Sequence, residues 1–107
     1  MLDLELISGF DWDAGNARKN DKHGVSMAEA EQVFFNIPLL LLDDVKHSQD
    51  EARHHALGQT HAARLLHITF TLRGESTRIR VISARDMHRK ERLAYEQAKK
   101  KENSRIP

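Results

Sequence analysis

Residues 76–92 read STRIRVISARDMHRKER, a stretch that predicts a strand running into a helix. In a strand, alternate side chains point to opposite faces. Ile79 and Val81 therefore share one face, which can join a hydrophobic core. Arg78 and Arg80 share the other face, about 7 Å apart by the rise per residue. This separation is close to the spacing of successive phosphates, so the basic face indicates a polyanion-binding sheet. An ordinary solvated strand face is the alternative.

The residues just before this stretch predict a second strand of the same sheet. Residues 64–72 alternate between apolar and polar side chains, which is typical of a half-buried strand, and residues 73–75 predict a hairpin turn. Antiparallel pairing would place His67 on the same open face as Arg78 and Arg80. The expected core face consists of Leu66, Ile68, Phe70 and Leu72, and the open face also includes Thr69 and Thr71.

The rest of the chain predicts a small α+β fold. The resulting order, approximately βααββββα, indicates a small antiparallel β-sheet packed with helices. The further predicted elements are a strand over 4–12, a polar helix over 13–20 that stops before Gly24, a helix after the Ser26/Glu29 capping box, a strand over 39–42 buried on both faces, a strand over 53–57, and a helix from Met87 to about Lys101 with Leu93 as its clearest apolar residue.

Length and composition bound the class of protein. A chain of 107 residues can form one small core, so residues 1–107 are predicted as one domain, with 102–107 as a frayed tail. The absence of cysteine excludes disulfides, thiolate zinc sites and a cysteine nucleophile. The chain starts with an acidic stretch unlike a signal peptide, and its longest apolar run, 37–42, is too short to span a bilayer. These features favour a cytoplasmic protein with no membrane partner.

The formal net charge of +1 conceals an uneven distribution of charge. Residues 1–51 hold eleven acids and four bases, whereas residues 52–107 hold thirteen bases and five acids. This division favours a polyanionic partner for the second half, or a protein partner that recognises both signs. An intramolecular match between the two halves is the alternative.

Seven histidines raise the hypothesis of a metal site, which their placement does not favour. His54 and His55 point to opposite faces of a strand, and no His-Glu-x-x-His helix is present. A cation site at Asp43, Asp44 and His47 is kept as an alternative. The sequence also lacks a phosphate loop, a Gly-x-Ser-x-Gly elbow and a dinucleotide fingerprint. It therefore predicts neither a metal nor a cofactor.

Chemistry without a cofactor on a basic surface points to RNA, which carries its own nucleophile in the 2′-hydroxyl. Cleavage needs a base for that proton, cations for the phosphorane charge and an acid for the leaving oxygen. Histidine and arginine can supply all three. A structural role, such as cross-strand pairing or helix capping, is the alternative for each histidine. The candidate proton-transfer groups are His23, His67 and His88, and the candidate phosphate clamps are Arg78, Arg80 and Arg85.

Two separated motifs resemble the signatures of the BrnT toxin family. Residues 10–26, FDWDAGNARKNDKHGVS, resemble the N-terminal signature, and residues 82–91, ISARDMHRKE, resemble the C-terminal one. The middle agrees at Asp43-Asp44 through His47-Ser48, at Glu51-Ala52-Arg53 and at Leu57-Gly58. The resemblance runs from about residue 6 to residue 97, which is nearly the whole chain.

The resemblance implies a RelE-like toxin fold and a ribonuclease toxin of a type II toxin–antitoxin module that blocks translation. Some RelE-like nucleases need the ribosome to complete the site. The expected partners are RNA, a BrnA-like ribbon-helix-helix antitoxin and, through that antitoxin, operator DNA. The alternatives are a non-catalytic module of the same fold that binds antitoxin or nucleic acid and, last, a metal-dependent hydrolase. The expected catalytic residues are His23, His67, Arg78, Arg80 and Arg85, and the expected RNA-binding residues are Lys19, Lys22, His88 and Arg89.

Overall fold

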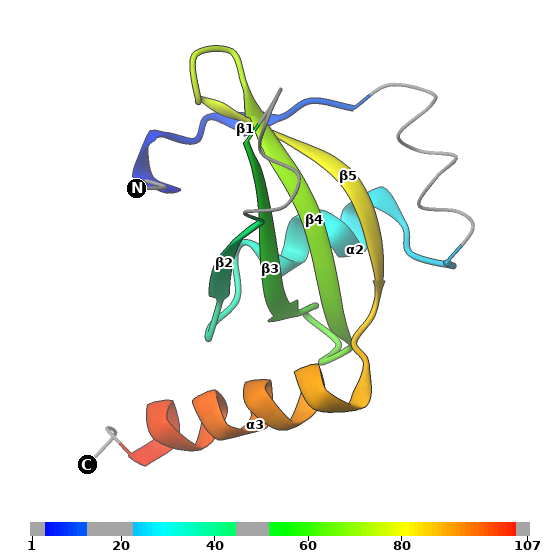
Figure 1. Ribbon diagram of the computed structural model, residues 1–107, viewed down its shortest axis with the longest axis vertical. Coiled ribbons are helices and arrows are strands. Elements are labelled where there is room, and N and C mark those ends of the chain that lie inside the picture. Colours follow the sequence, from blue (N-terminus) through cyan, green and yellow to red (C-terminus); the bar gives the residue numbers. More distant parts are fainter. Residues whose placement is uncertain (1–3, 13–22, 45–51, 105–107) are drawn as a thin grey trace.

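The computed structural model describes residues 4–12, 23–44 and 52–104. Within these ranges a 3₁₀ helix, η1, precedes five strands and two α-helices (Figure 1). Their order, βαββββα, differs from the predicted βααββββα, and the additional helix predicted over 13–20 lies outside the described residues. The elements are η1 (Leu4–Leu6), β1 (Gly9–Phe10), α2 (Met27–Val33), β2 (Leu40–Asp44), β3 (Arg53–Gln59), β4 (Leu65–Arg73), β5 (Arg78–Asp86) and α3 (Arg89–Ser104).

The five strands form one sheet in the order β1-β5-β4-β3-β2. Strands β2 to β5 pair antiparallel, as predicted, but β1 pairs parallel to β5. The sheet is therefore mixed, and the expectation of a purely antiparallel sheet was wrong. Only Gly9 and Phe10 of the strand predicted over 4–12 join the sheet. Parallel partners far apart in the chain have no hairpin turn between them, so the sequence gives no local signal for this pairing.

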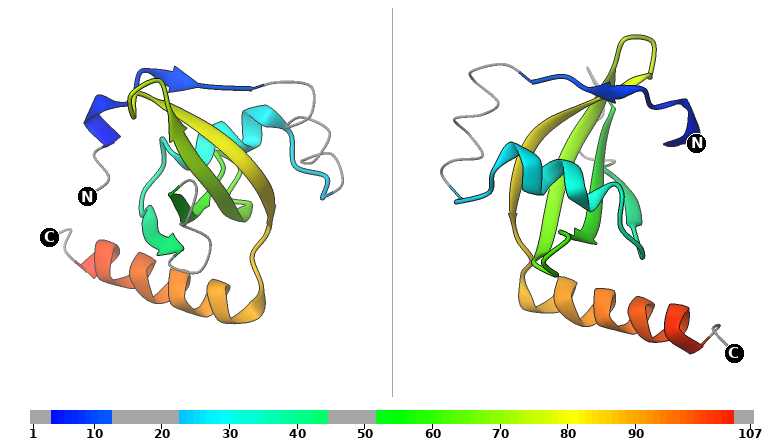
Figure 2. Two further views of the ribbon diagram at one scale, coloured as in Figure 1. Left: turned by 45° about the horizontal axis from the view of Figure 1, so that its top comes forward. Right: turned by 180° about the vertical axis from the view of Figure 1, so that it is seen from behind.

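Helix α2 crosses one face of the sheet and forms the main core with it (Figure 2, right). The predicted capping box is confirmed, because the Ser26 hydroxyl accepts from the Glu29 amide and the Glu29 carboxylate accepts from the Ser26 amide. Gly24 has φ +66°, in the left-handed region that favours glycine, and the helix that it was expected to stop lies outside the described residues. The predicted core residues Leu66, Ile68 and Phe70 of β4 are all fully buried against α2 and its neighbours, as are Val25, Ala30, Val33, Ala56, Ile79, Val81 and Ala84.

A β-bulge in β5 changes which side chains face away from α2. Thr69 of β4 pairs with Ser83, but the next residue, Phe70, pairs with Val81, so Ile82 has no partner in the register. We call the face opposite α2 the site face. Without the extra residue, Arg80 and Arg85 would lie on opposite faces because they are five positions apart. With it, the site face of the three long strands carries His55, His67, Thr69, Arg80, Ser83 and Arg85.

Helix α3 packs across one end of the sheet (Figure 1). Tyr95 is its buried anchor, with the hydroxyl donating to the Pro38 carbonyl at 2.7 Å. Tyr95, Met87 and Leu57 form a second small core. Leu93, expected as the clearest apolar residue of this helix, is 59% exposed, whereas Met87 and Tyr95, which the sequence marked as possible helpers, are buried. The side of the helix that meets the sheet is set by the link after β5, which places Tyr95 rather than Leu93 inward.

Strand β2 lies at the edge of the sheet, which corrects the prediction that it is buried on both faces. Leu42 is 58% exposed. A continuous apolar run indicates burial in a central strand, but an edge strand has a neighbour on one side only. The sequence pattern therefore identified the strand and misjudged its position.

Gly58 of β3 gives a test of the contact between the sheet and α2. A Cβ added at Gly58 would lie 2.6 Å from Cγ1 of Val33 and 3.3 Å from its carbonyl oxygen. We expect Gly58→Ala to lower the free energy of unfolding by about 1–3 kcal/mol through overpacking, measured by urea denaturation. Gly9→Ala is the matched control, because nothing lies within 4 Å of that position. Equal stability of the two variants would contradict this packing.

Candidate active site

Four charged or imidazole side chains meet on the site face near α3, and they come from four different elements. His67 lies on β4, Arg85 on β5, His55 on β3 and Glu91 in the first turn of α3. His67 and Arg85 are direct cross-strand partners. Together with Thr69 of β4 these residues form what we call the His67 cluster. The side chains of His67, Glu91 and Arg85 are 13%, 23% and 26% exposed, so the cluster is partly open to solvent.

Arg85 and Glu91 form a two-pronged ion pair inside the cluster. Nη1 of Arg85 donates to Oε1 of Glu91 at 2.8 Å, and Nη2 donates to Oε2 at 3.1 Å. Nη2 of Arg85 also contacts Nδ1 of His67. This geometry presents the guanidinium plane to a carboxylate, and a phosphate has matching oxygen geometry. The arrangement can therefore bind either anion.

The start of α3 fixes the position of Glu91. The backbone amide of His88, the residue before the helix, donates to Oε1 of Glu91 at 2.8 Å. A carboxylate is also stabilised by the partial positive charge at a helix N-terminus. Burial alone would raise the pKa of the Glu91 carboxyl, but the hydrogen bonds from Arg85 and from the His88 amide outweigh it and lower the pKa to about 2. Glu91 is therefore an anion at neutral pH.

His67 is an uncharged imidazole at neutral pH. Burial is the largest cause that lowers its pKa, and the positive charge of Arg85 adds to it. The carboxylate of Glu91, 3.1 Å from Nδ1, opposes these effects, and the resulting pKa is about 4. A neutral imidazole beside a guanidinium can accept a proton, which is the property of a general base.

His55 lies directly against His67 on the site face. Nδ1 of His55 lies 2.9 Å from Nε2 of His67 and 3.0 Å from Oγ1 of Thr69. The centroids of the two rings are 4.9 Å apart. The cross-strand pairing of His55 with Thr69 causes this contact, because it puts both imidazoles on the same face. Two imidazoles in hydrogen-bond contact can exchange a proton.

The structure separates Arg78 and Arg80 from the cluster. Arg85 pairs with His67 and Arg80 pairs with Thr71, four residues farther along β4, which corresponds to about 14 Å of strand. The Arg80 guanidinium lies 3.4 Å from the carboxylate of Asp11, beyond β1. Arg78 is exposed at the hairpin end of the sheet. Arg78 and Arg80 lie on the same face as His67, as predicted, but one phosphate cannot contact both Arg80 and Arg85.

The other predicted site residues lie around the cluster or elsewhere. His88 and Arg89 are exposed at the start of α3, next to Glu91. His23 is exposed in the turn before α2, where the carbonyl of the adjacent Gly24 accepts from Arg64 at 2.9 Å. His23 therefore lies with α2 on the other side of the sheet. Lys19, Lys22 and His47 lie outside the described residues.

Sequence reasoning missed two members of the cluster, His55 and Glu91. His55 was noted only as pointing away from His54, which is correct, but its pairing with Thr69 was not identified. The available signal was the alternation of residues 53–59, which places His55 and His67 on one face once the strands are in register. Glu91 had a weaker signal, since it stands three residues after His88, the spacing at which a glutamate accepts from the residue before a helix.

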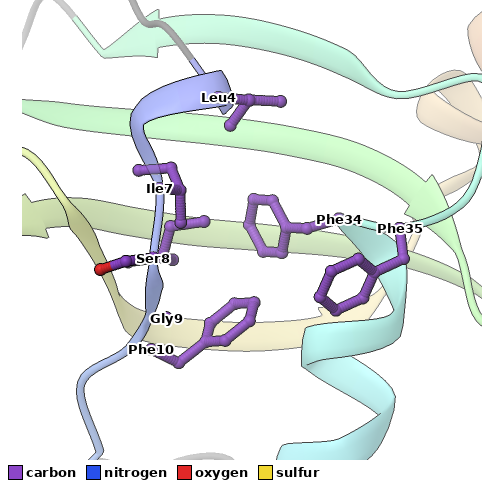
Figure 3. Close-up of a pocket in the computed structure, with 8 residues that line it drawn as sticks. Leu4, Ile7, Ser8, Gly9, Phe10, Phe34 and Phe35 are labelled. Atoms are coloured by element: carbon purple, nitrogen blue, oxygen red, sulfur yellow. The ribbon is translucent and has the colours of Figure 1, made fainter.

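An apolar hollow lies apart from the cluster (Figure 3). It has a volume of about 180 Å³ and lies between β1 and the end of α2. Phe10, Phe34 and Phe35 point into it from these two elements, and Phe35 is 71% exposed. Its lining includes no titratable side chain, so it cannot carry out acid–base chemistry.

Residues 4–12, 23–44 and 52–104 contain neither a cluster of metal-binding side chains nor a membrane-spanning helix. Within those ranges, no group of three or more histidine, aspartate or glutamate side chains is arranged to hold a metal ion. No helix in the same part of the chain has the length and apolar character needed to cross a membrane.

Comparison with known protein families supplies independent information. A family model with the description "Ribonuclease toxin, BrnT, of type II toxin-antitoxin system" matches residues 12–91. A search of curated proteins found no match. The matched span covers most of the chain and includes every member of the His67 cluster.

Glu91 gives a test of the electrostatics of the cluster. Its pKa is about 2 in the folded chain against an ordinary value of 4.5, so the ionised carboxylate stabilises the fold above pH 4.5, and this contribution is lost as the pH falls towards 2. We expect Glu91→Gln to be less stable than the native chain at pH 7 and to lose less stability between pH 4.5 and 2. Denaturant unfolding at several pH values measures this. Glu96→Gln, on the exposed side of α3, is the control, and identical pH dependence in Glu91→Gln and the native chain would contradict the assignment.

Proposed function

Since the chain belongs to the BrnT family of ribonuclease toxins of type II toxin–antitoxin systems, we propose that it cleaves RNA at the His67 cluster without a metal ion and thereby blocks translation. The observation that carries this proposal is the contact between a neutral imidazole, His67, and a guanidinium, Arg85, on one partly exposed face. A base and a cation at one point are what 2′-hydroxyl attack on phosphorus requires.

Arg85 is the proposed clamp for the scissile phosphate. Its guanidinium holds the carboxylate of Glu91 through two hydrogen bonds, and a phosphate presents the same pair of acceptors. The side chain is partly exposed, so an RNA phosphate can approach it. As charge develops on the phosphorane, the fixed guanidinium stabilises it more than water would.

His67 is the proposed general base. Its pKa of about 4 keeps it neutral at pH 7, with one ring nitrogen ready to accept a proton. In the free protein Nδ1 contacts Arg85 and lies 3.1 Å from Oε2 of Glu91. When the phosphate replaces Glu91 on the guanidinium, Arg85 turns towards the phosphate, the released carboxylate moves away, and Nδ1 becomes open to the 2′-hydroxyl. The 2′-oxygen then attacks phosphorus, and the 5′-oxygen leaves with the electron pair of the broken bond and takes a proton from water.

Arg78 and Arg80 are proposed to bind neighbouring phosphates. Their distance from Arg85 along the sheet, about 14 Å for Arg80 and about 20 Å for Arg78, argues against a role at the scissile phosphate. Side chains two residues apart on a strand are ~7 Å apart, close to the spacing of successive phosphates. The separation of Arg80 from Arg85 is twice that distance. RNA lying along β5 would therefore place phosphates on Arg85 and on Arg80 about two nucleotides apart. On the side of the cluster near α3, His88 and Arg89 are proposed to contact the RNA beyond the cleaved bond.

The proposed partners follow from the family. A type II toxin has a cognate antitoxin, and we propose a BrnA-like ribbon-helix-helix protein that also binds operator DNA. The proposed substrate is RNA in the cytoplasm, either free or held on the ribosome. Lys19 and Lys22 remain proposed RNA contacts. His23, which was expected to act in catalysis, is proposed as an RNA contact instead.

A second candidate function is a non-catalytic module that binds antitoxin or nucleic acid. The apolar surface at the far side of the sheet favours it, because Phe35 and Ile37 are 71% and 73% exposed and large exposed apolar patches often mark protein interfaces. A protein interface and an active site are compatible, so the discriminating measurement is RNA cleavage.

Substitutions in the cluster test the proposed activity. We expect His67→Ala and Arg85→Lys to slow RNA cleavage by about 10²–10³-fold, because each removes a group that acts in the transition state. Arg85→Lys retains the charge but loses the two-pronged geometry. The assay follows cleavage of free and ribosome-bound RNA in buffer containing EDTA, together with growth of expressing cells.

Antitoxin binding is the control for this experiment, because both variants should bind the antitoxin as the native chain does. Loss of native cleavage in EDTA would contradict metal independence. Uncut RNA and normal growth with the native chain would favour the non-catalytic module.

Arg78 tests the proposed path of the RNA. We expect Arg78→Ala to weaken the binding of a 2′-deoxy substrate analogue and to leave kcat unchanged. The slope of log Kd against log salt concentration should fall by about 0.7, the value for one phosphate contact on a single strand. Lys100→Ala removes the same charge from an exposed site on α3 and serves as the control. A fall in kcat comparable with that of Arg85→Lys would place Arg78 at the scissile phosphate instead.

A further inference from the structure

The contacts of the His67 cluster indicate which nitrogen of each imidazole carries the proton. A guanidinium can only donate hydrogen bonds. Nδ1 of His67 contacts Nη2 of Arg85, which can only donate, and lies 3.1 Å from Oε2 of Glu91, which can only accept. Oε2 already accepts from Nη2 of Arg85 at 3.1 Å, and a hydrogen on Nδ1 would be directed at the guanidinium. We therefore assign Nδ1 as the acceptor. In a neutral imidazole the proton is then on Nε2. Since Nε2 of His67 lies 2.9 Å from Nδ1 of His55, His67 donates to His55.

This assignment also indicates where a neutral His55 carries its proton. Its Nδ1 accepts from His67 and is 3.0 Å from the hydroxyl of Thr69, a second possible donor. A neutral His55 therefore carries its proton on Nε2. Both imidazoles have the same tautomer, and they are aligned so that a proton added to Nδ1 of His67 displaces the proton on Nε2 towards His55.

His67 alone is poorly placed to hold a positive charge. It is faced by Arg85 from β5, by His55 from β3, by Glu91 from α3 and by His88 just before that helix. The guanidinium and burial disfavour an imidazolium at this position, and Glu91 only partly offsets them. The ring of His55 lies one imidazole farther from Arg85. A positive charge on His55 is therefore separated from the guanidinium by the whole His67 ring, which lowers the repulsion.

We propose that His55 and His67 act as one proton acceptor: His67 takes the 2′-hydroxyl proton at Nδ1 and passes its Nε2 proton to Nδ1 of His55. The O–H bond of the ribose breaks as the Nδ1–H bond of His67 forms, and the Nε2–H bond of His67 breaks as the Nδ1–H bond of His55 forms. The pair gains one proton and one positive charge, which rests on His55. This role of His55 rests on the proposed ribonuclease activity, but the proton positions can be measured without RNA.

Nitrogen-15 NMR of histidine-labelled native protein tests the proton positions directly. At neutral pH we expect Nδ1 of His67 to be unprotonated and Nε2 to be protonated. If His67 carries its proton on Nδ1 at neutral pH, the proposal is overturned whether or not the protein cleaves RNA.

Kinetics of two His55 variants separate proton acceptance from packing. Glutamine can accept the hydrogen bond from His67 but cannot take the proton, and phenylalanine can do neither. We expect both His55→Gln and His55→Phe to cleave RNA about 10²-fold more slowly, the lower range for loss of general base catalysis. The acidic limb of the kcat/KM profile should move to lower pH in both, because His67 would then act alone.

The outcomes of the kinetic experiment are distinct. Native activity in His55→Gln with reduced activity in His55→Phe would show that His55 only positions His67, and would overturn the relay. The Lys100→Ala variant controls for unrelated loss of activity. If the native chain cleaves no RNA, the proposed function fails, and the NMR experiment still decides where the imidazole pair carries its protons.

Discussion

Ile82 has no partner on β4, and this one extra residue in β5 sets the chemistry of the sheet. Strict alternation would place Arg80 and Arg85 on opposite faces. The bulge restores Ala84 to the core after Val81 and turns Arg85 towards His67. The core therefore closes on one face while both arginines stay on the other. Bulges re-aim side chains in this way at many functional sites.

The electrostatics of the cluster depend on that placement. Arg85 contacts both Glu91 and His67. Its positive charge stabilises the anionic carboxylate of Glu91 and disfavours a positive charge on His67. Helix α3 completes the arrangement, because its first turn holds Glu91 through the His88 amide. An anion, a cation and a neutral base thus lie within hydrogen-bond distance of one another. In the proposed reaction, the RNA phosphate takes over the role that Glu91 has in the free protein.

The molecule divides its surface by chemistry. The site face has the imidazoles and Arg85 near α3, and Arg80 and Arg78 towards the hairpin. The apolar hollow around Phe10, Phe34 and Phe35 lies between β1 and the end of α2. Nucleic acid and a protein partner would therefore meet different parts of the sheet. This separation is consistent with a ribonuclease toxin that also has a cognate antitoxin.

The sequence by itself determined the elements of local origin. The capping box at Ser26, the alternation of Leu66, Ile68 and Phe70, and the strand that leads from Arg78 into a helix are all encoded by neighbouring residues, and all are confirmed. The resemblance to the BrnT signatures also identified the family correctly. Of the candidate site, His67 could be named from its residue type and from period-2 alternation, and Arg85 from its residue type and the resemblance to the C-terminal BrnT signature, whereas the face of Arg85 depends on the bulge.

Tertiary structure alone decided how these elements meet. The parallel pairing of β1, the edge position of β2 and the inward turn of Tyr95 rather than Leu93 depend on contacts between residues far apart in the chain. The bulge at Ile82 has no composition signal in the sequence, yet it moves Arg85 onto the site face. His55 and Glu91 also reach the site through tertiary contacts, His55 by its pairing with Thr69 and Glu91 by the docking of α3. Cross-strand register and helix docking are set by the packing of the whole core, which no local pattern contains.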